Sequence, residues 1–426
     1  MNRLGYSFLL YLLSPLILCY LAFRGIKSPD YRQRWSERFG FKKLQKTDLH
    51  IHSVSMGETL AAVPLIRGVL AENSALTVTI TTTSPTGSAE VKKAFKNELQ
   101  NGRVQHCYLP FDISFCIKRF LKQVSPRHCI IMETELWPNL IHYANKKNIK
   151  VMLANGRLSQ KSAAQYHKWK YISFPMLQKL SAIAVQTLIE AKRFEMLGVD
   201  PQKLHICGNL KFDLTISEQT KAKGIALREK WQKINSPIWI AGSVHPGEFE
   251  SIILAHKALL IHSPNALFIM IPRHPEQFKT AGDKLTSMGM NFIRLSDGES
   301  VSSEIQVVLG DTMGELLTLY GAADQAFIGG TLVKNGGHNP LEPAAMGLPV
   351  YSGPHYWNFD EITGLLKDAG NLKVVNDDAQ LALQLIAKSD DQNEWQISHK
   401  AGLKVVENNR GALQKQLTLA FDLINS

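Results

Sequence analysis

The residues best suited to bind a ligand lie in short polar segments that follow apolar runs in the second half of the chain. One segment is GGHNPLEPA at 336–344, in which Asn339 can cap a helix, Pro340 fits its first position and Glu342 its third. The free N–H groups of a helix start favour an anion, and Glu342 could accept hydrogen bonds from a ribose diol. Helix capping alone would also explain these residues.

Three further segments repeat the arrangement of a polar loop after an apolar run. They are GDTMGEL at 310–316, where Asp311 or Thr312 could cap a helix, IPRHPE at 271–276 and GSVHPGE at 242–248. Their side chains with polar chemistry are Ser243, His245, Arg273, His274, Asp311, Thr312 and Glu315. Taken singly, the arginine could be a surface cation and each histidine a structural one. Together they predict a pocket for an anionic ligand with hydroxyl groups, of nucleotide type.

The elements that must position these segments are short β-rich runs that alternate with longer amphipathic stretches. The runs are 49–55, 76–83, 128–132, 150–155 and 182–186, then 237–243, 266–272, 305–311, 325–330 and 348–354. This pattern predicts an α/β protein with parallel sheets covered by helices on both faces. The polar segment 217–236 is the expected linker between two such domains. The active site is expected in the cleft where strand carboxyl ends face each other.

Residues 1–24 are expected to form a membrane anchor. Leu4 to Phe23 is a 20-residue stretch without a charge, about the length that crosses a bilayer as a helix. Residues 1–46 hold nine Lys or Arg and two acidic residues, and most of the basic ones follow the apolar stretch. This asymmetry favours a helix that spans the membrane and a body on the cytoplasmic side, where the basic residues would attract anionic lipid. The alternatives are a helix lying in the interface and a cleaved signal peptide, although Arg24 and Lys27 stand where a small-residue cleavage site would be needed.

Composition excludes several classes of protein. Hydrophobic residues make up 45% and charged residues 20% of the chain, as in globular enzymes. The five cysteines form no CxxC pair, which indicates reduced thiols rather than a disulfide framework. No GxGxxG follows a strand, which argues against a nicotinamide-dependent oxidoreductase. Nucleic acid is not an expected partner, because the basic excess is assigned mainly to the anchor and no nucleic-acid-binding motif occurs.

Seven motifs, in order SVSMGE, METELWPN, GNLKFD, GSVHPGE, PRHPE, DTMGEL and GGHNPLEPA, resemble those of the 3-deoxy-D-manno-octulosonic acid (Kdo) transferases. The resemblance covers essentially the whole chain. It implies a GT-B fold of two Rossmann-like domains, with an acceptor-binding domain at 25–216, a CMP-Kdo-binding domain at 237–400 and a helix at 401–426 that returns toward the first domain. It also implies CMP-Kdo as donor, transfer with inversion, and as acceptor the phosphorylated, acylated disaccharide lipid IVA, the precursor of lipid A. The place of action would be the cytoplasmic face of the inner membrane.

The resemblance also implies roles for four residues of the first domain. Glu58, in SVSMGE, would be the base, and its alternative is a glutamate at a helix start that neutralises the helix dipole. Glu133 and Glu135, in METELWPN, compete for a supporting role in the transition state, with Glu135 slightly preferred. Lys211, in GNLKFD, would hold the carboxylate on the anomeric carbon of Kdo, and its alternative is a surface lysine.

For the donor, the resemblance implies contacts with both helix starts and with the strand end at 272. The expected donor-binding residues are Ser243, Pro272, Arg273, His274, Met313, Gly314, Glu315, Asn339, Pro340, Leu341 and Glu342. Arg273 would offset phosphate charge and Glu342 would hold the ribose. No metal and no other cofactor is expected; the HIH run at 50–52 is interpreted as structural.

Two alternatives remain at this point. The nearer is a GT-B glycosyltransferase that uses a different nucleotide sugar, which the choice between CMP, UDP and GDP donors would distinguish. The more distant is a membrane-bound nucleotide or lipid binder without catalysis. Such a binder could dispense with Glu58, so the intact motif around Glu58 argues against it.

Overall fold

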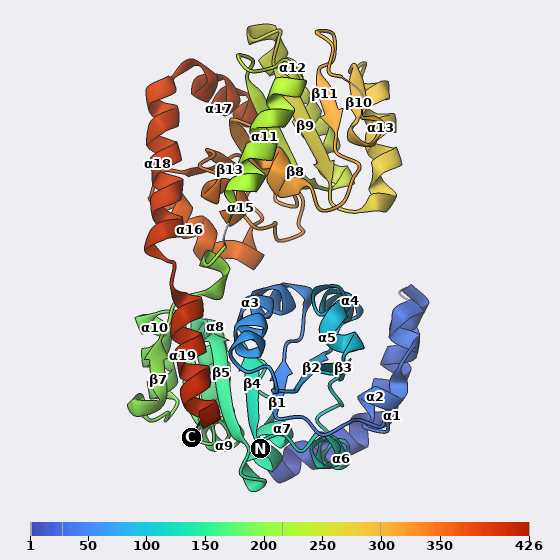
Figure 1. Cartoon of the computed structure of the whole chain (residues 1–426), viewed down its shortest axis with the longest axis vertical. Coiled ribbons are helices and arrows are strands. Elements are labelled where there is room, and N and C mark those ends of the chain that lie inside the picture. The colour runs from blue at the N-terminus through green and yellow to red at the C-terminus, as the bar shows by residue number, and fades with distance from the viewer. Residues whose placement is uncertain (1, 28, 215, 299, 426) are drawn as a thin grey trace. The chain divides into compact units, whose positions relative to one another are not determined.

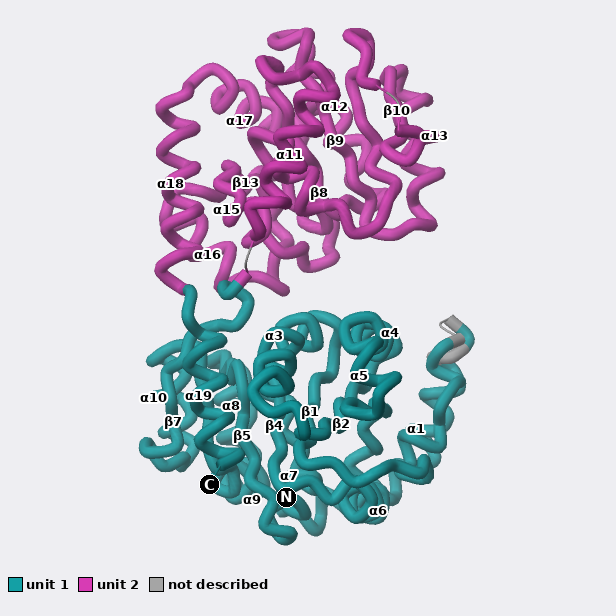
Figure 2. Tube along the Cα trace, in the orientation of Figure 1, with its two compact units in different colours: residues 1–213, 410–426 teal, residues 214–409 magenta. Residues whose placement is uncertain are grey.

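The computed structural model describes residues 2–27, 29–214, 216–298 and 300–425 and divides the chain into two compact units (Figure 2). Unit 1 comprises residues 1–213 and 410–426, and unit 2 comprises residues 214–409. Each unit is built on one parallel sheet of seven strands. The expectation of two α/β domains of the doubly wound type is confirmed.

The sheet of unit 1 has the order β3-β2-β1-β4-β5-β6-β7. Its strands are β1 (Leu49–His52), β2 (Val78–Thr82), β3 (Val104–Tyr108), β4 (His128–Met132), β5 (Lys150–Gly156), β6 (Ala182–Val185) and β7 (Leu204–Ile206). Its helices are α1 (Arg3–Lys27), α2 (Trp35–Arg38), α3 (Met56–Glu72), α4 (Pro85–Ala94), α5 (Lys96–Gln100), α6 (Ser114–Val124), α7 (Pro138–Lys146), α8 (Gln160–Lys168), α9 (Lys170–Leu177), α10 (Leu188–Met196) and α19 (Ala412–Asn425). Hydrophobic cores lie on both faces of this sheet, because the central strands are buried on both sides.

The sheet of unit 2 has the order β10-β11-β9-β8-β12-β13-β14. Its strands are β8 (Ile238–Val244), β9 (Leu267–Pro272), β10 (Phe292–Arg294), β11 (Val307–Leu309), β12 (Gln325–Ile328), β13 (Val350–Ser352) and β14 (Leu372–Val374). Its helices are α11 (Glu218–Lys230), α12 (Phe249–His262), α13 (Phe278–Ser287), α14 (Leu316–Tyr320), α15 (Leu341–Ala345), α16 (Asp360–Asp368), α17 (Asp378–Asp390) and α18 (Gln392–Asn408). The polar segments at 242–248 and 271–276 thus follow adjacent central strands.

The segment expected as a linker, 217–236, is largely the helix α11 and belongs to unit 2. Gly224 packs against Gly321 next to α14, where a Cβ atom would collide with backbone. Arg228 forms an ion pair with Asp324, with Nη2 at 3.0 Å from Oδ2. These contacts explain why a segment of polar composition is an integral helix rather than a spacer.

The end of the chain contains two helices where the sequence suggested one at 401–426 (Figure 1). The helix α18 belongs to unit 2 and α19 to unit 1 (Figure 2). The break lies at 409–411, where Gly411 has φ of +94°, a conformation that glycine adopts without strain. Asp213 then accepts hydrogen bonds from the N–H groups of Gly411 and Leu413, so the two segments of unit 1 meet directly.

The apolar helix α1 has the length and hydropathy to cross a bilayer over Arg3–Phe23. Its first turns contact unit 1, because Arg3 and Ser7 both donate hydrogen bonds to Oδ1 of Asn139 at 3.0 Å. Farther along the helix, Leu21 is buried. Large apolar side chains cover its outer face and are exposed, among them Leu4, Phe8, Leu12, Leu16 and Phe23.

Candidate active site

The carboxylate of Glu58 lies where β1 passes into α3. Ser55 caps this helix, and Glu58, three residues later, completes a capping box. Its oxygens accept hydrogen bonds from Val54 N at 2.8 Å and from Ser55 Oγ at 2.8 Å. Burial is the main cause of a raised pKa of Glu58, to which the charge of Glu133 adds, while the bonds from Val54 and Ser55 oppose it. The capping role is therefore compatible with a role as base, because the pKa of the Glu58 carboxyl group is raised although it accepts these bonds.

Two more carboxylates follow the adjacent strand β4. Glu133 has a left-handed backbone with φ of +53°, and its N–H donates to the carbonyl of Ala154 on β5 at 2.8 Å. Such a conformation is strained for a residue with a side chain. Burial, followed by the charges of Glu58 and Glu133, raises the pKa of Glu135 to about 7. The structure thus brings all three predicted acids together.

The predicted cation is part of the same group. Lys211 lies in a short 3₁₀ helix, Leu210–Phe212, after β7, and its Nζ is 3.6 Å from Oε1 of Glu133. Both side chains are about a quarter exposed, at 24% and 22%. Lys211 is therefore placed to bind an anion at the cluster, with Glu133 as its partner in the free protein.

Asn155, at the end of β5, is a residue of this site that the sequence analysis did not identify. It is fully buried and has φ of +52°, and its Oδ1 accepts a hydrogen bond from Leu210 N at 3.0 Å. Its buried Nδ2 has no acceptor among the described residues. The Oδ1 atom thus helps to fix the turn that carries Lys211, and the Nδ2 group is left as a donor for a further acceptor. The Asn-Gly pair that ends the apolar run was the available signal.

In unit 2, the ends of β8 and β9 carry the next predicted residues. Ser243 has φ of +59° at a register shift between these strands, and Arg273 N donates to Val244 O at 2.9 Å. Pro272 is buried as the last residue of β9, whereas His274 is exposed. Arg273 and His274 therefore lie at the edge of the sheet where β8 and β9 end.

Three histidines gather at this edge of unit 2. The Nε2 atoms of His245 and His338 are 3.0 Å apart, and their rings stack at 5.3 Å. His274 makes an edge contact with His245 at 6.1 Å between ring centroids. Burial, and then the charge of Arg273, lowers the pKa of His338 to about 3, so that this imidazole is neutral. No group of three potential metal ligands occurs in the part of the chain that the structure describes.

Glu248 organises the loop that the sequence analysis singled out, although it was not identified as a site residue. It is fully buried and accepts hydrogen bonds from the N–H groups of Gly330, Thr331 and Leu332 at 2.7–3.0 Å, and from His245 N at 3.0 Å. This one carboxylate therefore ties the loop after β12 to the loop after β8. Its place three residues after His245 was the signal.

The segment at 336–344 differs from the predicted cap, because α15 begins at Leu341, Pro340 is its N-cap and no side chain caps it. Asn339 Oδ1 accepts a hydrogen bond from Leu341 N at 3.1 Å, just before the helix. Burial raises the pKa of Glu342, which Asn339 and the nearby charge of Arg273 oppose. The structure thus brings Arg273 and Glu342 together. Pro340 and the Leu341 side chain are buried, so they can offer a ligand only backbone atoms.

The segment at 310–316 differs from the expected cap. Asp311 caps no helix, because its carboxylate accepts hydrogen bonds from Ser296 N and Oγ at 2.9 and 2.7 Å. Thr312 instead donates to Glu315 at 2.6 Å, and α14 begins only at Leu316. An exposed loop of Met313, Gly314 and Glu315 precedes the helix, and Gly314 has φ of +92°.

The HIH run is structural, as expected. His50 Nε2 lies 2.8 Å from Thr81 Oγ1, and His52 Nδ1 lies 2.9 Å from the same hydroxyl group. Both histidines are fully buried, and burial lowers the pKa of His50 to about 3 and that of His52 to about 4.

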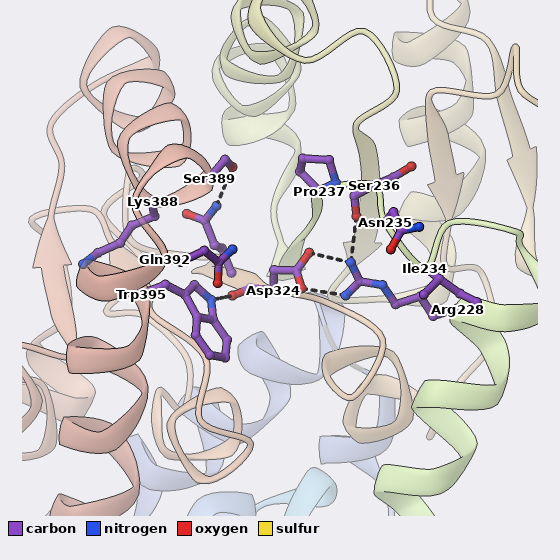
Figure 3. Close-up of a pocket in the computed structure, with 11 residues that line it drawn as sticks. Arg228, Ile234, Asn235, Ser236, Pro237, Asp324, Lys388, Ser389, Gln392 and Trp395 are labelled. Carbon is purple, nitrogen blue, oxygen red and sulfur yellow. Dashed lines mark hydrogen bonds and ion pairs between the residues drawn. The ribbon is translucent and has the colours of Figure 1, made fainter.

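A separate hollow of about 310 Å³ opens at the amino ends of the strands of unit 2 (Figure 3). Its charged side chains are paired: Arg228 with Asp324, which also lines the hollow, and Lys388 with Glu394, outside the lining, at 2.9 Å. Trp395 Nε1 also donates to Asp324 O at 2.8 Å. None of the predicted donor residues lines it, and ligands of open α/β sheets bind at the opposite, carboxyl ends.

Comparison with known proteins decides the family. Residues 33–214 match the model of the 3-deoxy-D-manno-octulosonic-acid transferase family (kdotransferase). The 3-deoxy-D-manno-octulosonic acid transferase of Haemophilus influenzae is 44% identical over 426 residues, which cover 98% of each chain. The chain belongs to the Kdo transferase family.

A second member of the family and two solved structures are also similar to the chain. The Kdo transferase of Bordetella pertussis is 33% identical over 82% of this chain and 83% of its own. UDP-GlcNAc 2-epimerase from Neisseria meningitidis is 13% identical, covers 88% of this chain and 98% of its own, and has a TM-score of 0.54, so the likeness concerns the GT-B-like fold alone. The C-terminal CMP-Kdo binding domain of WaaA from Acinetobacter baumannii is 28% identical over 45% of this chain and 100% of its own, with a TM-score of 0.43.

Proposed function

We propose that this member of the Kdo transferase family transfers Kdo from CMP-Kdo to the lipid A precursor lipid IVA, with inversion and release of CMP. The observation that supports it most is the group formed by Glu58, Glu133, Glu135 and Lys211 in unit 1, since it combines a buried base with a cation. In the reaction an acceptor hydroxyl oxygen bonds to the anomeric carbon of Kdo, the bond from that carbon to phosphate breaks, and the hydroxyl proton is lost.

Glu58 is the proposed acceptor of that proton. Burial raises its pKa, so the carboxylate is a better base than an exposed glutamate. The neighbouring negative charge of Glu133 adds to this effect. Glu135 is proposed to support the transition state, because a carboxyl group with a pKa of about 7 can be charged or neutral at working pH.

Lys211 is proposed to bind the carboxylate of the transferred sugar. In the free protein its ammonium group lies 3.6 Å from Oε1 of Glu133, so a cation that can bind a carboxylate stands beside the acids. Fixing the sugar carboxylate holds the reacting carbon in register with the acceptor hydroxyl.

In unit 2, we propose that Arg273 and Glu342 bind the two ends of CMP. Arg273 offsets the charge of the phosphate that leaves, and Glu342 accepts hydrogen bonds from the ribose. The exposed backbone N–H groups at 313–315 are proposed to help bind the phosphate. The remaining proposed contacts are Ser243, Pro272, His274, Asn339, Pro340 and Leu341.

We propose that α1 attaches the protein to the cytoplasmic face of the inner membrane and that anionic lipid is a partner of the basic residues after it. The apolar outer face of α1 and the exposed Arg32, Lys43 and Lys46 support this. Arg38 is buried, and Arg34 and Lys42 form ion pairs with Glu37, so these three serve unit 1 itself.

A helix that crosses the bilayer must give up the bonds of Arg3 and Ser7 to Asn139. A reporter fused to the N-terminus distinguishes a helix that crosses the bilayer from one that lies in its interface. Only the crossing helix places the reporter in the periplasm.

Mass spectrometry of a reaction with CMP-Kdo and lipid IVA tests the proposed reaction. The wild type should add Kdo-sized mass increments, and Glu58→Gln should slow this by about 10²-fold or more, as loss of a general base does. Glu190→Gln is the matched control, because Glu190 completes a capping box with Thr187 on α10 in the same way. No increment from folded wild type, or equal activity of the two variants, would refute the proposal.

A further inference from the structure

A second cavity of about 310 Å³ lies in unit 1, beside the acids. Its walls come from the loop after β4 and from α8 and α9, with Tyr6 of α1 at one side, and are mostly apolar. Leu136, Tyr166, Trp169, Ile172 and Met176 supply most of this surface. A space of this size is at the lower end of the range of about 300–1,000 Å³ for ligand sites. Its lining suits a slender apolar group rather than a sugar.

The cavity adjoins the loop that carries Glu133 and Glu135. Leu136 follows Glu135 in the chain, and the Tyr166 hydroxyl group donates to the carbonyl of Thr134 at 3.5 Å. Burial raises the pKa of Tyr166 to about 12, and the charge of Glu135 contributes, so the two side chains are neighbours. A molecule held in the cavity therefore lies next to the carboxylates.

The surface around the cavity is basic and aromatic. From Leu136 to Ile189 the sequence has eight Lys or Arg residues and no Asp or Glu. Lys161, Lys168 and Lys170 on α8 and α9 are exposed. Trp169 and Tyr171, at the same place, are exposed by 44% and 68%. Exposed aromatic rings with lysines are typical of a surface that meets lipid head groups.

We infer that this cavity binds one acyl chain of the phosphorylated lipid acceptor, while the lysines of α8 and α9 face its phosphates. The inference rests on the proposed function, because it assigns a subsite to the acceptor of that reaction. The apolar lining is complementary to the chain and the acid-free surface to the phosphates. An acyl chain held beside Glu135 fixes the distance of the acceptor hydroxyl from the base.

Quenching of Trp169 fluorescence by a brominated fatty acid tests the site without any sugar transfer. The full chain is kept in a bile-salt detergent, because that has no alkyl chain to fill the cavity. The protein has seven tryptophans. The contribution of Trp169 is therefore obtained as the difference in quenching between the wild type and Trp169→Phe. We expect saturable quenching in the wild type. Absence of a Trp169 signal in protein that transfers Kdo would overturn this inference and leave the proposed function intact.

Two variants on α9 separate the cavity from the surface. Ile172→Arg places a charge in the cavity and should abolish the saturable quenching, whereas Tyr171→Arg, at the next residue but outside the lining, should retain it. Ile172→Gln is the milder variant should the arginine impair folding, and thermal unfolding of each variant reports that. An equal loss of saturable quenching in the Ile172→Arg and Tyr171→Arg variants would contradict the inference.

Competition then identifies the occupant. Lipid IVA should displace the brominated fatty acid at a concentration at least tenfold lower than phosphatidylglycerol does. Equal or stronger displacement by phosphatidylglycerol would overturn the inference, because the cavity would then hold a membrane lipid. For transfer, Ile172→Arg should lower kcat/KM for lipid IVA about tenfold and leave the KM for CMP-Kdo unchanged. A wild type that binds the chain but transfers no Kdo would refute the proposed function alone.

Discussion

Glu135 makes the free energy of unfolding depend measurably on pH. Its pKa is raised from 4.5 to about 7, mainly by burial, so the folded protein holds a proton here that the unfolded chain releases between these values. The free energy of unfolding therefore falls as the pH rises through this window and stays lower above it. The full effect is roughly 3 kcal/mol, at about 1.4 kcal/mol for each unit.

We predict that Glu135→Gln raises the thermal midpoint by roughly 5–10 °C at pH 8 and much less at pH 5, since glutamine does not titrate. Calorimetry at the two pH values checks this. Glu190→Gln, which changes a capping carboxylate on α10, should show no such difference between the two pH values. An equal rise at both pH values for the Glu135 variant would contradict the assignment.

Arg273 allows a test of donor binding that needs no acceptor. Arg273→Ala should weaken the binding of CMP by roughly 10- to 100-fold, because a hydrogen bond to a charged group contributes about 1.5–3 kcal/mol. Titration calorimetry measures this directly. Lys279→Ala removes an exposed charge from the same unit and should leave the affinity unchanged. The same loss in both variants would indicate a general effect of charge instead of a contact.

Some site residues could be predicted from the sequence and others could not. The motifs identified Glu58 and Lys211, and the structure brings them together with Glu133 and Glu135. Asn155 was missed because its importance comes from a buried amide group beside the turn at Lys211, and that contact joins distant parts of the chain. A spacing rule cannot reveal such a partner.

At the level of elements, the strands absent from the sequence analysis are the edge strands of the two sheets. They are β3, β7, β10 and β14, at the ends of the observed orders. β7 and β10 have no fully buried residue, and β14 has one. The apolar runs that mark a strand arise from burial on both faces, so the central strands were predicted and most edge strands lack the signal.

The distribution of basic residues was also only partly predicted. The charge analysis assigned the excess mainly to residues 1–46, yet the acid-free part of unit 1 from 136 to 189 is as basic. Its lysines are spread over α7, α8, α9 and the strands between, so no short run of charge is visible. Only the fold shows that Lys161, Lys168 and Lys170 flank one cavity.

The outer face of α1 carries the prediction for membrane attachment. Leu12 and Leu16 are exposed by 65% and 63%, and each aspartate placed there costs about 2.5–3.5 kcal/mol on insertion. The double variant Leu12→Asp and Leu16→Asp should move most of the protein from the membrane pellet to the soluble fraction. Ile261→Asp alters an exposed apolar residue of α12 in unit 2 and should stay with the membrane. Retention of the double variant in the pellet would mean that α1 is not the anchor.

At the scale of the whole molecule, α19 makes unit 1 discontinuous in sequence. Gln416 is fully buried and bonds both Asn155 N and Gly208 O, and Ala420 belongs to the core of unit 1. We predict that residues 214–409 fold alone, whereas residues 1–213 alone do not. Joining 213 to 410 through a short glycine linker should restore unit 1, because Asp213 already contacts Gly411.

Circular dichroism and thermal unfolding of the three pieces, purified in detergent where α1 is present, check this prediction. Cooperative unfolding of residues 1–213 without α19 would contradict it. A piece 214–409 that has no cooperative transition would contradict the independence of unit 2.

The position of α19 also has a consequence for synthesis. The ribosome produces residues 1–213 before unit 2 and α19 after it. Unit 2 can fold while the chain is still growing, at about 5–20 residues per second, but unit 1 must wait for residues 410–426 to emerge. A chain that is cut short anywhere before its last helix is therefore left with an incomplete unit 1, the unit that holds the proposed base. The proposed active site of unit 1 can therefore be completed only after the ribosome has passed all of unit 2.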